Sequence, residues 1–186
     1  MKKIAYFFEF ILIKILFILF LLIGYRLSSN LGFFIGRTIG PIFRSKKKII
    51  QNLEKANIQH PNLSKIASNV LGNYGRIFAE YNYLKKFRND ELKKYISIDG
   101  LEHLENLKKQ NKKAVFISGH FNNFELMAME IEKAGINLAA IYRPLNNIFL
   151  NKTMEKIRKE NICKNQIKKG RAGSRDLLHH DGGDCA

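Results

Sequence analysis

The residues best suited to chemistry stand together in one short block, Gly-His-Phe-Asn-Asn-Phe-Glu, at positions 119–125. His120 follows an apolar run, and Glu125 opens a stretch with a helix-like pattern. A carboxylate in the first turn of a helix can hold one imidazole nitrogen while the other nitrogen faces a substrate hydroxyl. The block therefore predicts a catalytic pair, with His120 as the general base and Glu125 as its orienting acid.

A purely structural interpretation competes with this one. Asn122 and Glu125 match an N-cap and its capping-box partner, which would leave His120 as an ordinary loop residue. Six residues alone do not decide between the two, because a short motif occurs often by chance and depends on its surroundings.

The segments around this block alternate between strand-like and helix-like patterns from Tyr95 onward. We expect strands at Tyr95–Ile98, Ala114–Ser118 and Leu138–Tyr142, and helices at Leu101–Asn111, Glu125–Lys133 and Phe149–Lys159. Such alternation is typical of an α/β domain with a mixed, largely parallel sheet and flanking helices. The second expected strand is nearly all apolar, as buried parallel strands are.

Two polar clusters would meet at one edge of that sheet. His120 follows the second expected strand and Tyr142-Arg143-Pro144 follows the third, and ligands gather at the carboxyl ends of parallel strands. The Arg143 guanidinium suits a phosphate group, while a surface ion pair is an equal alternative.

An apolar segment, Ile4–Ile23, opens the chain. It has about 20 residues, roughly 30 Å as a helix, which is enough to cross a bilayer core although Glu9 and Lys14 interrupt it. We expect an uncleaved transmembrane anchor, because no small-x-small cleavage site follows. A helix lying in the membrane interface is the remaining alternative. Basic residues crowd the carboxy-terminal flank, so the positive-inside rule predicts that the large carboxy-terminal part is cytoplasmic.

Two further helical patterns follow the anchor. Gly32, Gly36 and Gly40 recur every four residues, which allows close approach to another helix or to the membrane surface. Apolar residues between Leu63 and Phe87 step by three and four, as in an amphipathic helix that packs into a core. Pro61 and Asn62 supply its breaker and a plausible cap.

The composition limits the choice of partners. The 186 residues include 32 Lys and Arg against 16 Asp and Glu, a formal net charge of +16. Such an excess favours nucleic acid, an anionic membrane or an acidic carrier protein. The anchor and the lack of a nucleic-acid-binding signature argue against nucleic acid. Cys163 and Cys185 have no metal-ligand spacing and match ordinary thiols of a reducing compartment.

Together these blocks resemble the bacterial lipid A biosynthesis acyltransferases, which add secondary acyl chains to lipid A. The resemblance covers most of the chain, in the expected order behind the anchor. Its blocks are the basic stretch with Asn-Leu-Glu (Lys46–Lys55), Asn-Tyr-Gly with a following glutamate (Asn73–Glu80), Asp-Gly-Leu-Glu (Asp99–Glu102), the block around His120, and Tyr-Arg-Pro-Leu-Asn-Asn (Tyr142–Asn147).

The resemblance implies a membrane enzyme of the bacterial inner membrane that transfers a fatty acyl chain from acyl carrier protein to a hydroxyl of a lipid A precursor. It implies His120 and Glu125 as catalytic residues and Arg143, Tyr142 and Asn123 as substrate-binding residues. No cofactor and no metal are expected; acyl carrier protein, the lipid A precursor and membrane lipid are the expected partners. A basic face suits the acidic carrier or anionic lipid, although a solvated helix face is the default for such a run. That face comprises Lys152, Lys156, Lys159, Lys164, Lys168 and Lys169.

The sequence departs from the family at its end. After a helix-like segment at Gly170–Leu178, the last residues read HHDGGDCA, whereas family members continue with further strands. We expect a shortened chain with residues 1–25 as anchor, 26–60 as a basic interfacial segment, 61–178 as an incomplete acyltransferase-like domain and 179–186 as an aberrant tail. Two alternatives stay open: a non-catalytic membrane-anchored fragment, and a glycerolipid acyltransferase, which usually has aspartate where this chain has Glu125.

Overall fold

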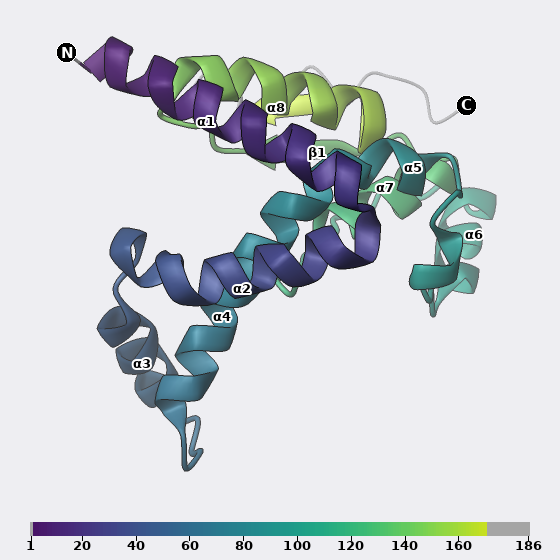
Figure 1. The fold of residues 1–186 in the computed structure, drawn as a ribbon. Coiled ribbons are helices and arrows are strands. Elements are labelled where there is room, and N and C mark those ends of the chain that lie inside the picture. Colours follow the sequence, from purple (N-terminus) through teal and green to yellow (C-terminus); the bar gives the residue numbers. More distant parts are fainter. Residues whose placement is uncertain (1, 171–186) are drawn as a thin grey trace. The chain divides into compact units, whose positions relative to one another are not determined.

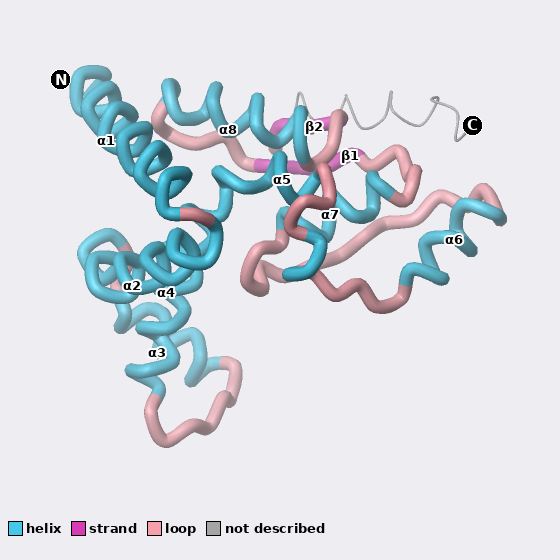
Figure 2. The backbone as a smooth tube through the Cα atoms, turned by 45° about the vertical axis from the view of Figure 1, so that its right-hand side comes forward, coloured by secondary structure: helices cyan, strands magenta, loops and turns pink. Residues whose placement is uncertain are grey.

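The computed structural model describes residues 2–170 (Figure 1; Figure 2). The contacts of these residues form two compact units, one made of residues 2–13 and 84–170 and the other of residues 14–83. The helix expected at Gly170–Leu178 lies almost wholly, and the tail 179–186 wholly, outside the described residues.

The unit of residues 14–83 is helical. It contains the end of α1 (Lys2–Ile23), followed by α2 (Tyr25–Phe43), α3 (Lys46–Lys55), α4 (Leu63–Glu80) and a short 3-10 turn (Tyr81–Tyr83). The predicted cap of α4 is confirmed: the Asn62 side-chain oxygen accepts a hydrogen bond from the Lys65 amide at 2.8 Å. Because the 3-10 turn interrupts the predicted amphipathic helix, that pattern is divided between α4 and the short α5 (Leu84–Arg88).

The glycines of α2 face α4, which Figure 1 shows beside it. A Cβ atom added to Gly36 would lie 2.5 Å from the Leu71 carbonyl oxygen, and one added to Gly32 would lie 2.6 Å from that of Gly75. Side chains at these positions would therefore force the helices apart. The glycine spacing predicts close approach either to another helix or to the membrane surface, and in the structure the glycines approach another helix, α4.

Buried polar contacts join α2 to α4 and the 3-10 turn to α1. The Ser29 hydroxyl donates to the Glu80 carboxylate at 2.8 Å, and both residues are buried. The Tyr83 hydroxyl donates to the Phe20 carbonyl oxygen at 2.5 Å. These bonds satisfy polar groups that would otherwise be expensive to bury.

The other unit combines helices with a small sheet. It contains the start of α1, then α5, a 3-10 turn (Lys93–Tyr95), α6 (Leu101–Lys109), α7 (Glu125–Lys133), β1 (Ala139–Tyr142), α8 (Ile148–Asn161) and β2 (Asn165–Lys168). The three helices predicted in this region are confirmed, and so is the strand ending at Tyr142.

The predicted sheet is smaller than expected. Tyr95–Ile98 is a 3-10 turn and loop, and Ala114–Ser118 forms no strand, so the prediction of strands there is wrong. Val115 and Ile117 are 88% and 92% exposed. A buried parallel strand needs a neighbour that completes its hydrogen bonds, and an apolar sequence cannot supply that neighbour by itself. The described residues therefore hold a mostly helical fold with one two-stranded parallel sheet, which Figure 2 shows in magenta.

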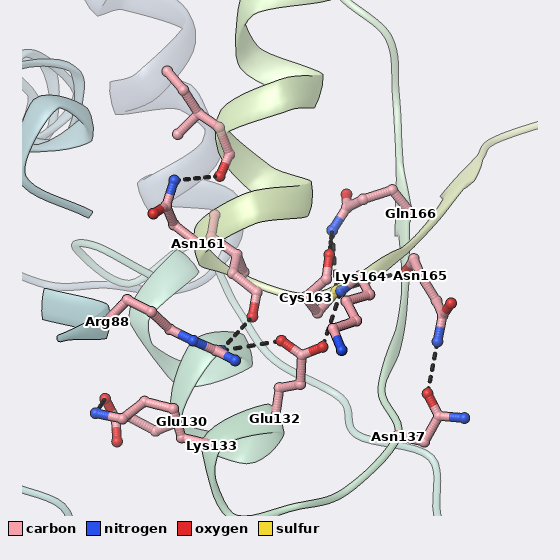
Figure 3. Close-up of polar contacts among 12 residues, drawn as sticks. Arg88, Glu130, Glu132, Lys133, Asn137, Asn161, Cys163, Lys164, Asn165 and Gln166 are labelled. Carbon is pink, nitrogen blue, oxygen red and sulfur yellow. Dashed lines mark hydrogen bonds and ion pairs between the residues drawn. The ribbon is translucent and has the colours of Figure 1, made fainter. Parts of the chain in front are cut away.

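The second strand was not predicted, because its sequence, Asn-Gln-Ile-Lys, is polar. It pairs in parallel with β1, with Ala139 opposite Asn165 and Tyr142 opposite Lys168. Polar contacts at its start hold it in place (Figure 3): the Asn165 amide donates to the Asn137 side-chain oxygen at 2.7 Å, and the Lys164 amide donates to Glu132 of α7 at 3.0 Å. Arg88 of α5 also reaches Glu132, at 3.1 Å. These contacts fix α7 relative to the end of α8 and to the sheet.

Candidate active site

The start of α7 differs from a capping box. Phe124 occupies the N-cap position and has no side-chain capping bond. Asn122 lies in the left-handed region with φ +50°, a conformation that asparagine tolerates better than most residues. Its carbonyl oxygen accepts from the Phe124 amide at 3.0 Å. The capping-box interpretation of Asn122 and Glu125 is therefore wrong, and the glutamate side chain is used elsewhere.

Glu125 forms an ion pair with Arg158 of α8. The Arg158 Nε and Nη2 atoms lie 2.9 and 2.8 Å from the same carboxylate oxygen, Oε1. The Glu125 side chain is 8% exposed and that of Arg158 is 18% exposed. Since a buried carboxylate is costly without a partner, Arg158 accounts for the presence of Glu125 in the interior.

Tyr142, at the end of β1, belongs to the same polar group. The Arg158 guanidinium lies 5.8 Å from the centre of its ring, and its hydroxyl donates to the carboxylate of Glu155, one turn before Arg158 on α8. Glu155 also accepts from Asn151 at 2.9 Å and from Lys168 of β2 at 3.2 Å. Burial, followed by this hydrogen bond, raises the pKa of the Tyr142 phenol, so Tyr142 stays protonated and donates to the carboxylate.

Arg158 thus brings together two of the predicted site residues, Glu125 and Tyr142. The other three lie as follows: the exposed His120 ring packs on Phe124 with centroids 4.4 Å apart, Asn123 is partly buried, and Arg143 is exposed. The expectation that the loops after two strands meet at one sheet edge loses its basis, because the segment before His120 is not in the sheet.

Two residues of this group, Arg158 and Glu155, were not predicted. The sequence predicts a basic face that includes lysines of α8, and Lys152, Lys156 and Lys159 are exposed. A second stripe of the same helix carries Asn151, Glu155 and Arg158 at positions i, i+4 and i+7. A stripe mixing an amide, an acid and an arginine, beside a lysine face, was the available signal for a buried polar contact.

The start of α8 is tied to α1. The Asn147 side-chain oxygen caps α8 by accepting from the Phe149 and Leu150 amides at 3.0 and 3.2 Å. Its amide nitrogen donates to the Glu9 carboxylate at 2.8 Å and to the Tyr6 carbonyl at 2.9 Å. Asn147 is 6% exposed. Glu9, the acid that interrupts the apolar segment, is itself exposed, but its carboxylate is bonded to Asn147.

This arrangement can perform acid–base chemistry near an exposed imidazole. His120 precedes the Glu125 carboxylate by five positions, and that carboxylate is fixed by an arginine from another helix. A carboxylate has several lone-pair directions and can accept from an imidazole and a guanidinium together. Among the described residues, no cluster of three or more His, Cys, Asp or Glu side chains forms a metal site.

Comparison with protein families decides the identity. The model of the family described as bacterial lipid A biosynthesis acyltransferase matches residues 1–169. The chain belongs to this family. It is therefore an acyltransferase, and its acceptor is a lipid A precursor. Comparison with curated proteins and with solved structures found no match.

Within the acyltransferase, the match covers α1, nearly all the described residues of both units and the site around Glu125. It favours a lipid A enzyme over the glycerolipid acyltransferase that the sequence left open.

Proposed function

We propose that this acyltransferase moves a fatty acyl chain from acyl carrier protein to a hydroxyl of a lipid A precursor, with His120 as the general base. The observation that carries the proposal is the position of His120 before Glu125, whose carboxylate is held in the interior by Arg158. Family membership supplies the reaction class.

The reaction needs a base because a sugar hydroxyl is a weak nucleophile at neutral pH. Its oxygen attacks the thioester carbonyl carbon while the imidazole of His120 takes its proton. The carbon–sulfur bond then breaks, the carrier thiolate takes the proton from the imidazolium, and an ester remains on the lipid. General-base catalysis of this kind contributes roughly 10²- to 10⁴-fold in rate.

Glu125 and Arg158 prepare the imidazole for this role. The carboxylate orients one ring nitrogen and stabilises the imidazolium that forms. Arg158 fixes the position of the carboxylate through two hydrogen bonds from a charged donor. The catalytic unit proposed is therefore His120, Glu125 and Arg158, the last as a positioning residue.

Three other residues are proposed to meet the substrates. Arg143 is exposed in the loop that follows β1. Its guanidinium can bind a phosphate of the acceptor or of the donor's phosphopantetheine. Tyr142 and Asn123 would line the same region. The charge of +16 suits an acidic carrier protein as the donor.

Location at the cytoplasmic face of the inner membrane completes the proposal. Among the described residues, α1 is the helix with the length and composition to cross a membrane. Exposed apolar side chains follow the helix and include Ile4, Phe8, Ile11, Leu12 and Ile15, although Glu9 and Lys14 are exposed as well. The contact between Glu9 and Asn147 favours the interfacial alternative over a single-pass span, because a crossing helix would carry Glu9 away from a domain that receives a cytoplasmic donor.

The decisive test is acyl transfer by the detergent-solubilised protein. Radiolabelled acyl carrier protein and a lipid A precursor should give an acylated lipid, and His120→Ala should lower the rate by about 10²- to 10⁴-fold. His103→Ala is the matched control, since His103 is an exposed histidine of α6. Equal rates for wild type and His120→Ala would contradict the proposed base. Transfer to glycerol 3-phosphate in place of the lipid A precursor would contradict the proposed acceptor.

A further inference from the structure

Helix α2 exposes several large apolar side chains. Leu27, Leu31, Phe34 and Ile42 follow one another at spacings of four, three and eight residues, and their exposed fractions are 63%, 42%, 62% and 79%. The buried residues of α2 are the small ones, Ser28, Ser29 and Gly32, and among its large side chains the Phe33 ring lies against Gly72 of α4. This is the reverse of a helix on a water-soluble protein, which buries its large apolar residues.

Such an inversion is typical of helices in contact with lipid. Small residues there allow close helix packing, and large apolar residues face the acyl chains. The polar side chain within the outward stripe fits the same environment: the Thr38 hydroxyl donates to the Phe34 carbonyl oxygen at 2.8 Å. Its donor is therefore satisfied within the helix and does not need water.

The charges around α2 indicate which kind of surface it meets. The sequence has no acidic residue between Phe10 and Leu53. Arg26 and Arg37 border the apolar stripe, and Arg44 and Lys46–Lys48 follow the helix. Each basic residue near an anionic bilayer contributes about 1 kcal/mol to binding. An apolar stripe bordered by basic residues matches a helix that lies in the plane of an anionic membrane.

We propose that α2 is a second membrane-binding element, lying in the interface of an anionic bilayer with Leu27, Leu31, Phe34 and Ile42 among the acyl chains. The inference rests on the membrane location proposed for α1, because Gly24 is the one residue that separates α1 from α2. It adds a lipid contact to the unit that holds α4.

The chain has no tryptophan, which allows a direct test. Leu27→Trp, Phe34→Trp and Ile42→Trp each introduce a single reporter on α2; Leu19→Trp reports on α1, and Leu101→Trp, at an exposed position of α6, is the control. The variants are reconstituted in vesicles of phosphatidylglycerol and phosphatidylethanolamine that carry bromine either near the headgroups or near the acyl-chain ends. Circular dichroism confirms the helical content of each variant.

If α2 lies in the interface, all three α2 tryptophans lose most of their fluorescence to the shallow bromines and much less to the deep ones, while Leu101→Trp is unaffected. A spanning α2 would instead give deep quenching at Phe34→Trp and shallow quenching at both ends, which would overturn the proposal. An α2 that binds another protein would give no quenching at any of its three positions, which would also overturn it.

Leu19→Trp separates this inference from the proposed membrane location. If it is quenched while the α2 reporters are not, α1 binds the membrane and the inference about α2 fails. If the α2 reporters are quenched and Leu19→Trp is not, the inference stands and the role of α1 is wrong.

The charges that follow α2 can be tested separately. Lys47→Gln with Lys48→Gln should weaken binding to anionic vesicles several-fold more than Lys109→Gln with Lys112→Gln, which removes the same charge elsewhere. Equal effects would contradict the proposed role of these charges.

Discussion

At the scale of single residues, the ion pair between Glu125 and Arg158 should affect both the stability of the fold and the proposed catalysis. Both side chains are largely buried, at 8% and 18% exposure. Replacing Arg158 by methionine leaves the carboxylate without its charged partner, so we expect a loss of about 3–5 kcal/mol in the free energy of unfolding. Urea denaturation of the detergent-solubilised variant measures it.

A double-mutant cycle distinguishes the pair from two independent residues. Arg158→Met combined with Glu125→Leu should be markedly less destabilising than the sum of the two single changes, because neither charge is then left buried alone. Additive losses would show that the two side chains do not interact energetically. Arg158→Lys should keep part of the stability but lose activity, since a lysine cannot reproduce the Nε and Nη2 bonds.

The hydrogen bond between Tyr142 and Glu155 predicts a pH dependence. This bond, first among several contacts, lowers the pKa of the Glu155 carboxyl below 4.5. A lowered pKa stabilises the folded state above pH 4.5 and loses that effect as the pH falls through the folded value. Tyr142→Phe should therefore reduce stability by about 1.5–3 kcal/mol near neutral pH and by less in acid.

The opposite sign applies to Tyr142 itself. Its raised pKa contributes stability below pH 10.0, which is lost as the pH rises further. Urea denaturation at a series of pH values measures both effects, the loss of stability in acid and the loss above pH 10.0. Tyr74→Phe is the control, because the Tyr74 ring stacks with Arg44 and its contact does not need the hydroxyl. A pH-independent effect of Tyr142→Phe would contradict the assigned charge states.

At the scale of helices, the contact between α2 and α4 depends on glycine. A Gly36→Ala change normally stabilises a helix by about 1 kcal/mol. Here the new Cβ would lie 2.5 Å from the Leu71 carbonyl oxygen. We expect a net loss of about 1–3 kcal/mol from the overpacked contact. Gly40→Ala meets only the Leu71 side chain, at 3.1 Å, and should be nearly neutral; thermal unfolding compares the two.

The link between α1 and α8 can be tested through Asn147. Asn147→Asp keeps an oxygen for the cap of α8 but places a second carboxylate beside Glu9. It should destabilise the protein by about 1–3 kcal/mol, and Glu9→Gln in the same chain should restore most of the loss, because glutamine can donate to the new acid. Failure of Glu9→Gln to rescue would mean that the two helices are held together mainly by the packing of Phe7 and Phe10 on Phe149, with ring centres 5.8 and 6.0 Å apart.

At the scale of the whole molecule, the positive charge should govern the encounter with the donor. Attraction between a chain of net charge +16 and an acidic carrier is screened by salt. We expect KM for acyl carrier protein to rise at least several-fold between low and physiological ionic strength, with kcat little changed. KM for a short acyl-pantetheine donor should stay nearly constant. Parallel salt effects on both donors would exclude steering of the carrier.

The sequence alone determined the parts of this protein that depend on local order. Periodicity located α4, α6, α7 and α8, composition identified α1, and side-chain chemistry identified the Asn62 cap. The block around His120 indicated the reaction class that the family match supports. These features are readable because a helix completes its hydrogen bonds within its own segment, so its residues carry most of the information.

Only the tertiary structure decided which segments pair and which charges meet. Ala114–Ser118 has a strand-like sequence but pairs with no strand within residues 2–170, whereas the polar Asn165–Lys168 pairs with β1 because Asn137 and Glu132 hold its start. Arg158 became visible as the partner of Glu125 only when α7 and α8 were brought together. A strand or a buried charge is satisfied by groups distant in the chain, and a linear pattern shows that a partner is required without showing which residue supplies it.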